Sequence, residues 1–174
     1  MLKTGGNYME ELLNQIKLAL DNKLYLIALQ STLTIPDICA KLSTTKEETN
    51  KHDYMKWYQN NIINKQQLTT EDCYYFRCGM LHEGKAQHKN MKLSRVIFLV
   101  PNDSIVFSGN TFSINGKKAI NIDLPTFCNE MINCALKWWN ENKDDTIVKN
   151  NYESIIKYYP NGFAPFIGGI PVIA

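Results

Sequence analysis

The hydrophobic pattern of this chain changes its period near residue 93 and changes back near residue 124. From about residue 8 to residue 84, apolar side chains recur every three to four positions, the spacing of amphipathic helices. Residues 94–123 instead carry β-branched and aromatic side chains in short runs separated by turn residues. Helical spacing then returns. The pattern predicts a mainly α fold, a helical bundle with a small antiparallel β-hairpin or sheet inserted around residues 94–123.

The expected elements follow from caps and breaks within this pattern. Pro36 fits the first turn of a helix, Thr69 and Asp72 have the spacing of a capping box, and Asn115-Gly116 favours a hairpin turn. The expected helices cover residues 8–28 with a break at Asn22, 36–42, about 44–63, 69–84, 125–140 and 145–158. The expected strands cover residues 95–101, 104–107, 111–114 and 119–123.

The length of 174 residues, 44% of them hydrophobic, suits one globular core and is short for two. We therefore expect a single helical domain over residues 1–174. Residues 1–7 are small and polar and predict a flexible leader. Residues 159–174 predict an apolar tail that lies against the body of the protein or against a partner.

Charge and cysteine content narrow the class of protein. The 19 Lys and Arg against 17 Asp and Glu give a formal charge of +2, so any contact with nucleic acid must be local. Five cysteines form an odd set with no dense framework, which favours reduced thiols in the cytoplasm. The apolar runs are shorter than the roughly 18 residues that a membrane helix needs, so we expect no membrane contact.

Arg77 and His82 are the best clue to function. Arg77 is one of only two arginines in a chain that otherwise uses lysine for positive charge. A guanidinium suits a phosphate and an imidazole can transfer protons near neutral pH, so the pair indicates phosphodiester chemistry or nucleotide binding. On an ideal helix the two positions point about 140° apart. They could meet if the helix loosens near Gly79, if its end frays before Gly84, or if a second subunit presents the same helix.

Simpler interpretations of the same residues stay open. Arg77 could form a salt bridge with Asp72 or Glu83, and His82 could be a helix-end residue that favours the negative end of the helix dipole.

Cys73, Cys78, His82 and His88 are all zinc-compatible ligand types, but their spacing differs from that of structural zinc sites. A thiol nucleophile at Cys78 with His82 lacks a recognisable oxyanion loop. We expect neither a metal nor a cofactor.

The segment after the motif is basic. Lys85, His88 and Lys89 are candidates for nucleic-acid binding because they could draw a phosphate backbone toward Arg77 and His82. The alternative is an ordinary soluble surface.

The segment Arg77-Cys-Gly-Met-Leu-His82, on an expected helix and followed by a glycine, resembles the signature of HEPN domains, an arginine and a histidine separated by four to six residues. The resemblance implies a helical domain, usually a homodimer, in which these two residues line a shared cleft and cleave RNA without a metal. It differs from the family at Cys78, where many such domains carry a polar residue, often asparagine, and in the β-segment, which the minimal bundle lacks.

We therefore expect a metal-independent endoribonuclease or an RNA- or nucleotide-binding protein of the HEPN type, by analogy part of a bacterial or phage conflict system. The alternative is a non-catalytic, dimeric interaction module of the same fold.

Overall fold

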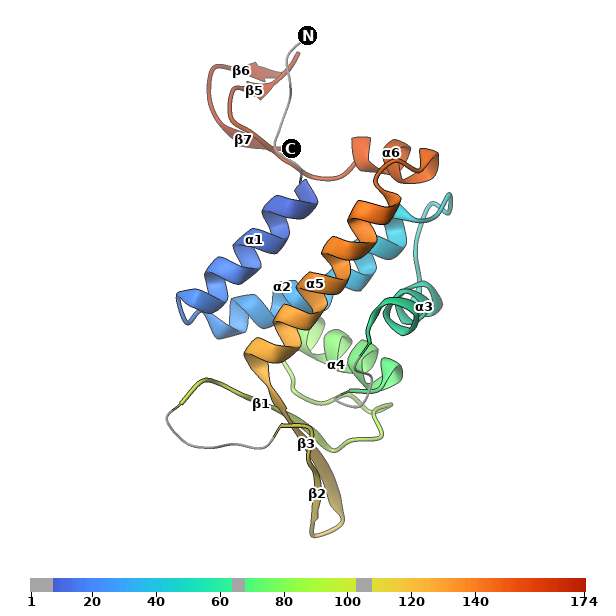
Figure 1. Ribbon diagram of the computed structural model, residues 1–174, viewed down its shortest axis with the longest axis vertical. Helices are drawn as coiled ribbons and strands as arrows, with labels where there is room; N and C mark the ends of the chain where they lie inside the picture. Colours follow the sequence, from blue (N-terminus) through green and yellow to red (C-terminus); the bar gives the residue numbers. More distant parts are fainter. Residues whose placement is uncertain (1–7, 64–67, 103–107) are drawn as a thin grey trace.

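The computed structural model describes residues 8–63, 68–102 and 108–174 (Figure 1). Within these ranges the helices are α1 (Tyr8–Asp21), α2 (Tyr25–Leu42), α3 (Lys51–Asn61), α4 (Thr70–Glu83), α5 (Leu124–Asn142) and α6 (Thr146–Glu153). The strands between α4 and α5 are β1 (Arg95–Leu99), β2 (Thr111–Ile114) and β3 (Lys117–Asp123). The mainly α fold with a small inserted sheet is confirmed. The expected leader at residues 1–7 and the expected strand at residues 104–107 lie outside the described residues.

Helix α2 forms the centre of the bundle and contacts α1, α3, α4, α5 and α6. Its side chains Leu33, Ile35 and Cys39 are fully buried, because neighbours cover the helix on several sides. The prediction of a separate helix that begins at Pro36 is wrong, since Pro36 lies inside the continuous α2. A proline weakens a helix interior by removing one hydrogen bond. Here the proline is itself buried among the core residues, so packing keeps the two halves of the helix together.

The inserted sheet has the strand order β1-β3-β2, and its topology differs from the expected antiparallel one. β2 and β3 form an antiparallel hairpin around Asn115-Gly116, but β1 pairs with β3 in parallel, with Val96 opposite Ile120. The reason is burial. All four residues of β2 are exposed, whereas Ile120 and Ile122 of β3 are 5% and 0% exposed. The strand with the buried face takes the centre, and the exposed hairpin projects away from the bundle (Figure 1).

The C-terminal tail folds back on itself. β4 (Tyr158–Tyr159) pairs with β7 (Val172–Ile173), and β5 (Gly162–Phe163) pairs with β6 (Ile167–Gly168). α6 is shorter than expected because residues 157–159 pair with the end of the chain instead of continuing the helix. Figure 1 places this tail beyond the N-terminal end of α1.

None of the helices in the described ranges combines the length and the apolar composition needed to cross a bilayer.

Candidate functional site

Helix α4 carries the Arg77 and His82 pair, and both of its ends are fixed as its sequence predicts. At the start, the amide of Asp72 donates to Thr69 Oγ1 at 3.1 Å, and the Thr69 hydroxyl donates to Asp72 Oδ2 at 2.8 Å. At the end, Gly84 adopts the left-handed conformation with φ 63°, and its amide donates to the carbonyl of Met80. The helix is continuous between these caps.

Arg77 and His82 meet within one chain. Arg77 Nη1 lies 3.2 Å from His82 Nε2. The estimate of about 140° describes directions at the helix axis, but the long arginine side chain reaches the last turn of the helix all the same. The contact therefore needs neither a loosened helix near Gly79 nor a second subunit. Because a guanidinium only donates, Nε2 accepts with its lone pair, and in this arrangement the ring proton sits on Nδ1.

Asp37 of α2 is the third member of the site, and it is not among the residues predicted from the sequence. Arg77 donates to Asp37 Oδ2 twice, from Nε at 2.8 Å and from Nη2 at 2.6 Å. Arg77 therefore does form an ion pair, as in the simpler interpretation, but its partner is Asp37 of a different helix rather than Asp72 or Glu83. Burial raises the pKa of the Asp37 carboxyl, and the charge of Arg77 opposes this rise. The only sequence signal is one acid within the mostly apolar C-terminal half of α2.

The segment that follows α4 is folded back against the helix at Gly79. A methyl group at this position would lie 2.5 Å from the carbonyl oxygen of Gln87 and 3.2 Å from that of Lys85. Further along, the amide of Lys92 donates to Oδ1 of the buried Asp72 at 2.9 Å. The segment thus passes close to the backbone at Gly79 and is bonded to Asp72 at Lys92. The basic segment is thus shaped by the helix that carries Arg77.

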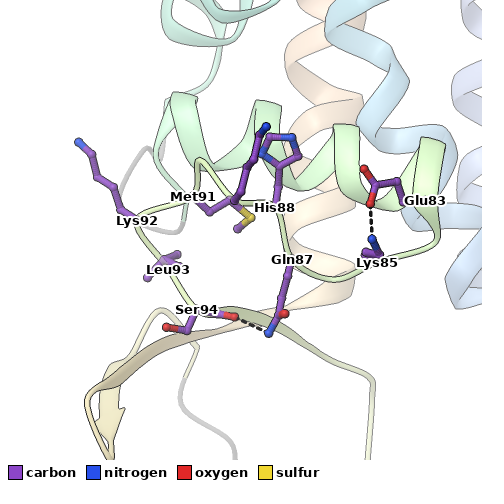
Figure 2. Close-up of a pocket in the computed structure, with 9 residues that line it drawn as sticks. Glu83, Lys85, Gln87, His88, Met91, Lys92, Leu93 and Ser94 are labelled. Carbon is purple, nitrogen blue, oxygen red and sulfur yellow. Dashed lines mark hydrogen bonds and ion pairs between the residues drawn. The ribbon is translucent and has the colours of Figure 1, made fainter.

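The structure brings Lys85, His88 and Lys89 together around one hollow of about 580 Å³, formed by residues 83–94 (Figure 2). Lys85 Nζ pairs with Glu83 at 2.5 Å, and His88 stacks on Tyr75 with ring centroids 4.8 Å apart. Lys89 is exposed. Lys92 adds another cation to the lining. Glu83, which directly follows His82 in the chain, connects this hollow with the Arg77 cluster.

The cysteines of the zinc hypothesis lie in different environments. Cys73 is fully buried with Sγ 3.5 Å from Tyr54 Oη, and burial raises the pKa of its thiol to about 12. Cys78 is partly exposed, with Sγ 3.9 Å from Arg77 Nη1. His88 stacks on Tyr75 rather than turning toward Cys73. In the described parts of the chain, no group of three or more His, Cys, Asp or Glu side chains is arranged to hold a metal ion.

Comparison of the chain with protein-family models, with curated proteins and with solved structures found no match. The candidate site is therefore defined by its own geometry: an imidazole and a carboxylate on either side of one guanidinium, next to a basic hollow.

Proposed function

We propose that this chain is a metal-independent ribonuclease of the HEPN type, acting in the cytoplasm through Arg77 and His82. The observation that carries the proposal is the 3.2 Å contact between Arg77 Nη1 and His82 Nε2 at the exposed end of α4. A group suited to a phosphate and a group suited to a proton thus lie within reach of one phosphodiester. By family analogy, the biological setting is a bacterial or phage conflict system.

In this mechanism His82 acts as general base toward a ribose 2′-hydroxyl or as general acid toward the leaving 5′-oxygen, and Arg77 stabilises the charge of the phosphorane. Nε2 is the nitrogen that takes the proton, because its lone pair points at Arg77 in the resting site. When the phosphate binds, Nη1 turns from Nε2 to a phosphate oxygen and releases that lone pair. Asp37 holds the opposite side of the guanidinium during this change.

The basic hollow provides the neighbouring phosphate contacts in this proposal. Lys85, His88, Lys89 and Lys92 all line it, so the positive charge is concentrated locally although the whole chain is only +2. Lys89 carries most of this role, because Lys85 pairs with Glu83, Lys92 Nζ lies 3.9 Å from Glu71, and His88 is stacked on Tyr75. RNA binding through this hollow should weaken as the salt concentration rises.

One observation favours a second candidate, a non-catalytic and dimeric interaction module of the same fold. All three guanidinium nitrogens of Arg77 have partners in the same chain: Nε and Nη2 contact Asp37, and Nη1 contacts His82. A guanidinium that is satisfied in this way can serve structure alone. Both candidate functions expect a homodimer. Size-exclusion chromatography with light scattering measures the oligomeric state directly.

The test incubates the purified protein with mixed RNA in the presence of EDTA. The wild type should cleave, and His82→Ala and Arg77→Ala should each lower the rate by roughly a hundredfold or more, since each removes one group from the transition state. The chain offers matched controls in His52→Ala on α3 and Arg95→Ala at the start of β1, both of which are exposed. These should keep the wild-type rate.

Unchanged cleavage in either His82→Ala or Arg77→Ala contradicts the proposal. A wild type that forms dimers but leaves RNA intact favours the interaction module instead.

A further inference from the structure

Asp37 also lines a second hollow, of about 370 Å³, on the side of the cluster formed by α2 and α6. This volume lies at the lower end of the range of roughly 300–1,000 Å³ that is common for small-molecule sites. Its walls are mostly aliphatic, and the side chains that supply them are Ile38, Leu42, Ile155 and Ile156. A flat apolar ring fits such walls better than a phosphate does.

The hollow is held in shape by Asn151. The side-chain amide of this residue donates to the carbonyl groups of Lys41, Leu42 and Thr44, at 3.1, 3.0 and 2.7 Å. These carbonyls lie at the C-terminal end of α2 and just beyond it, so α6 is held to the helix that carries Asp37. The two walls therefore keep their spacing without a ligand.

Within the described parts of the chain, one oxygen of Asp37 has no hydrogen-bond partner and can recognise a ligand. Oδ2 accepts both hydrogen bonds from Arg77, whereas Oδ1 accepts none from the residues that the structure describes. A carboxylate offers about four acceptor positions, so Asp37 can hold Arg77 and bind N–H donors at once. Lys41, the cation that lines the same hollow, directs its Nζ to the carbonyl of Lys46 at 2.6 Å.

We propose that this hollow binds the nucleobase adjacent to the scissile phosphate, with guanine preferred. For its choice of ligand class the inference rests on the proposed function. Unstacked bases are read by hydrogen bonds at their edges and by apolar contact on their faces. Guanine presents two adjacent N–H donors to a carboxylate, whereas uracil presents one N–H between two carbonyl groups that repel it. Asp37 thus joins the positioning of Arg77 to the choice of base.

The test titrates the four nucleoside 3′-monophosphates separately into the full chain labelled at isoleucine methyl groups. GMP should shift the signals of Ile38, Ile155 and Ile156 and leave those of Ile170 in the tail unchanged. It should bind about fivefold or more tightly than UMP. Thr49→Trp, in the lining of the hollow, should abolish these shifts because the larger side chain fills the space, and Asp37→Asn should remove the preference for guanine over uracil.

The possible results separate this inference from the ribonuclease. Shifts at the hollow that Thr49→Trp abolishes, together with the guanine preference, support the base site even if the wild type cleaves no RNA. Equal affinity for all four nucleotides overturns the inference even if RNA is cleaved. Shifts only at the basic hollow around Lys89 overturn it as well, because the nucleotide then binds through its phosphate alone.

Discussion

The first half of α4 is buried in the core, whereas its second half carries the candidate site near the surface. Cys73 and Phe76 are 0% and 3% exposed and belong to the core, and the buried Asp72 fixes both the start of the helix and the segment that follows its end. Arg77, which directly follows Phe76, donates to Asp37 and lies 3.2 Å from His82, an exposed residue in the last turn of the helix. The buried half therefore sets the position from which the exposed half can reach a ligand. Substitutions in the two halves should therefore differ sharply in their effect on stability.

The largest effect is expected for Asp72→Ala, about 3 kcal/mol less free energy of unfolding. The change removes the side chain that caps the helix with Thr69 and leaves the amide of Lys92 without its acceptor. Urea denaturation followed by circular dichroism measures the loss. Glu71→Ala is the neighbouring control. Its ion pairs with Lys51 and Lys92 are exposed, so it should cost about 0.5 kcal/mol or less. Equal losses of unfolding free energy in Asp72→Ala and Glu71→Ala would contradict the structural role given to Asp72.

Gly79→Ala should cost about 2 kcal/mol, because the new methyl group would lie 2.5 Å from the Gln87 carbonyl oxygen and force the following segment away. The same denaturation experiment applies. Gly168→Ala in the tail is a suitable control, since a methyl group there meets nothing within 4 Å and the change should be nearly neutral. A fully stable Gly79→Ala variant would show that residues 85–87 do not depend on this close contact.

Arg77→Ala should cost less, about 1 kcal/mol, although it removes the centre of the candidate site. The pair with Asp37 is partly exposed, with 20% and 28% of the two side chains accessible, so water compensates for part of the lost interaction. Thermal unfolding of this variant should therefore remain cooperative within a few degrees of the wild type. A loss as large as that expected for Asp72→Ala would place Arg77 in the structural half of α4.

The smallest expected effect is a loss of folding stability at alkaline pH. Burial raises the pKa of the Cys73 thiol from 9.0 to about 12, so in the unfolded state the thiol ionises at lower pH than in the folded state. The stability that this gives is complete below about pH 9 and is lost as the pH rises toward 12. Between pH 8 and pH 9.5 the loss from Cys73 is about 0.8 kcal/mol. Cys73→Ala should flatten the decline by this amount, whereas Cys78→Ala should keep it, because Cys73 remains. Identical slopes in both variants would contradict the prediction.

Local signals in the sequence predicted much of the fold. The Thr69 cap, the Gly84 stop and the Asn115-Gly116 turn act over a few residues, and each is found where it was expected. The helix boundary predicted at Pro36 is wrong because a proline is only a local signal for a break, whereas packing around α2 decides whether the helix breaks. The order of the strands also escaped the sequence, since it depends on which strand is covered by the helices.

The candidate site also has one part that the sequence predicts and one part that depends on how the helices pack. The sequence by itself determined that Arg77 and His82 share one capped helix and that a basic segment follows it, because these are matters of spacing and capping along the chain. Only the tertiary structure decided that Asp37, 40 positions before Arg77, completes the cluster and borders a second hollow. An ion pair between two helices depends on how the helices pack, and packing is fixed by the burial of the whole core rather than by the residues around the pair.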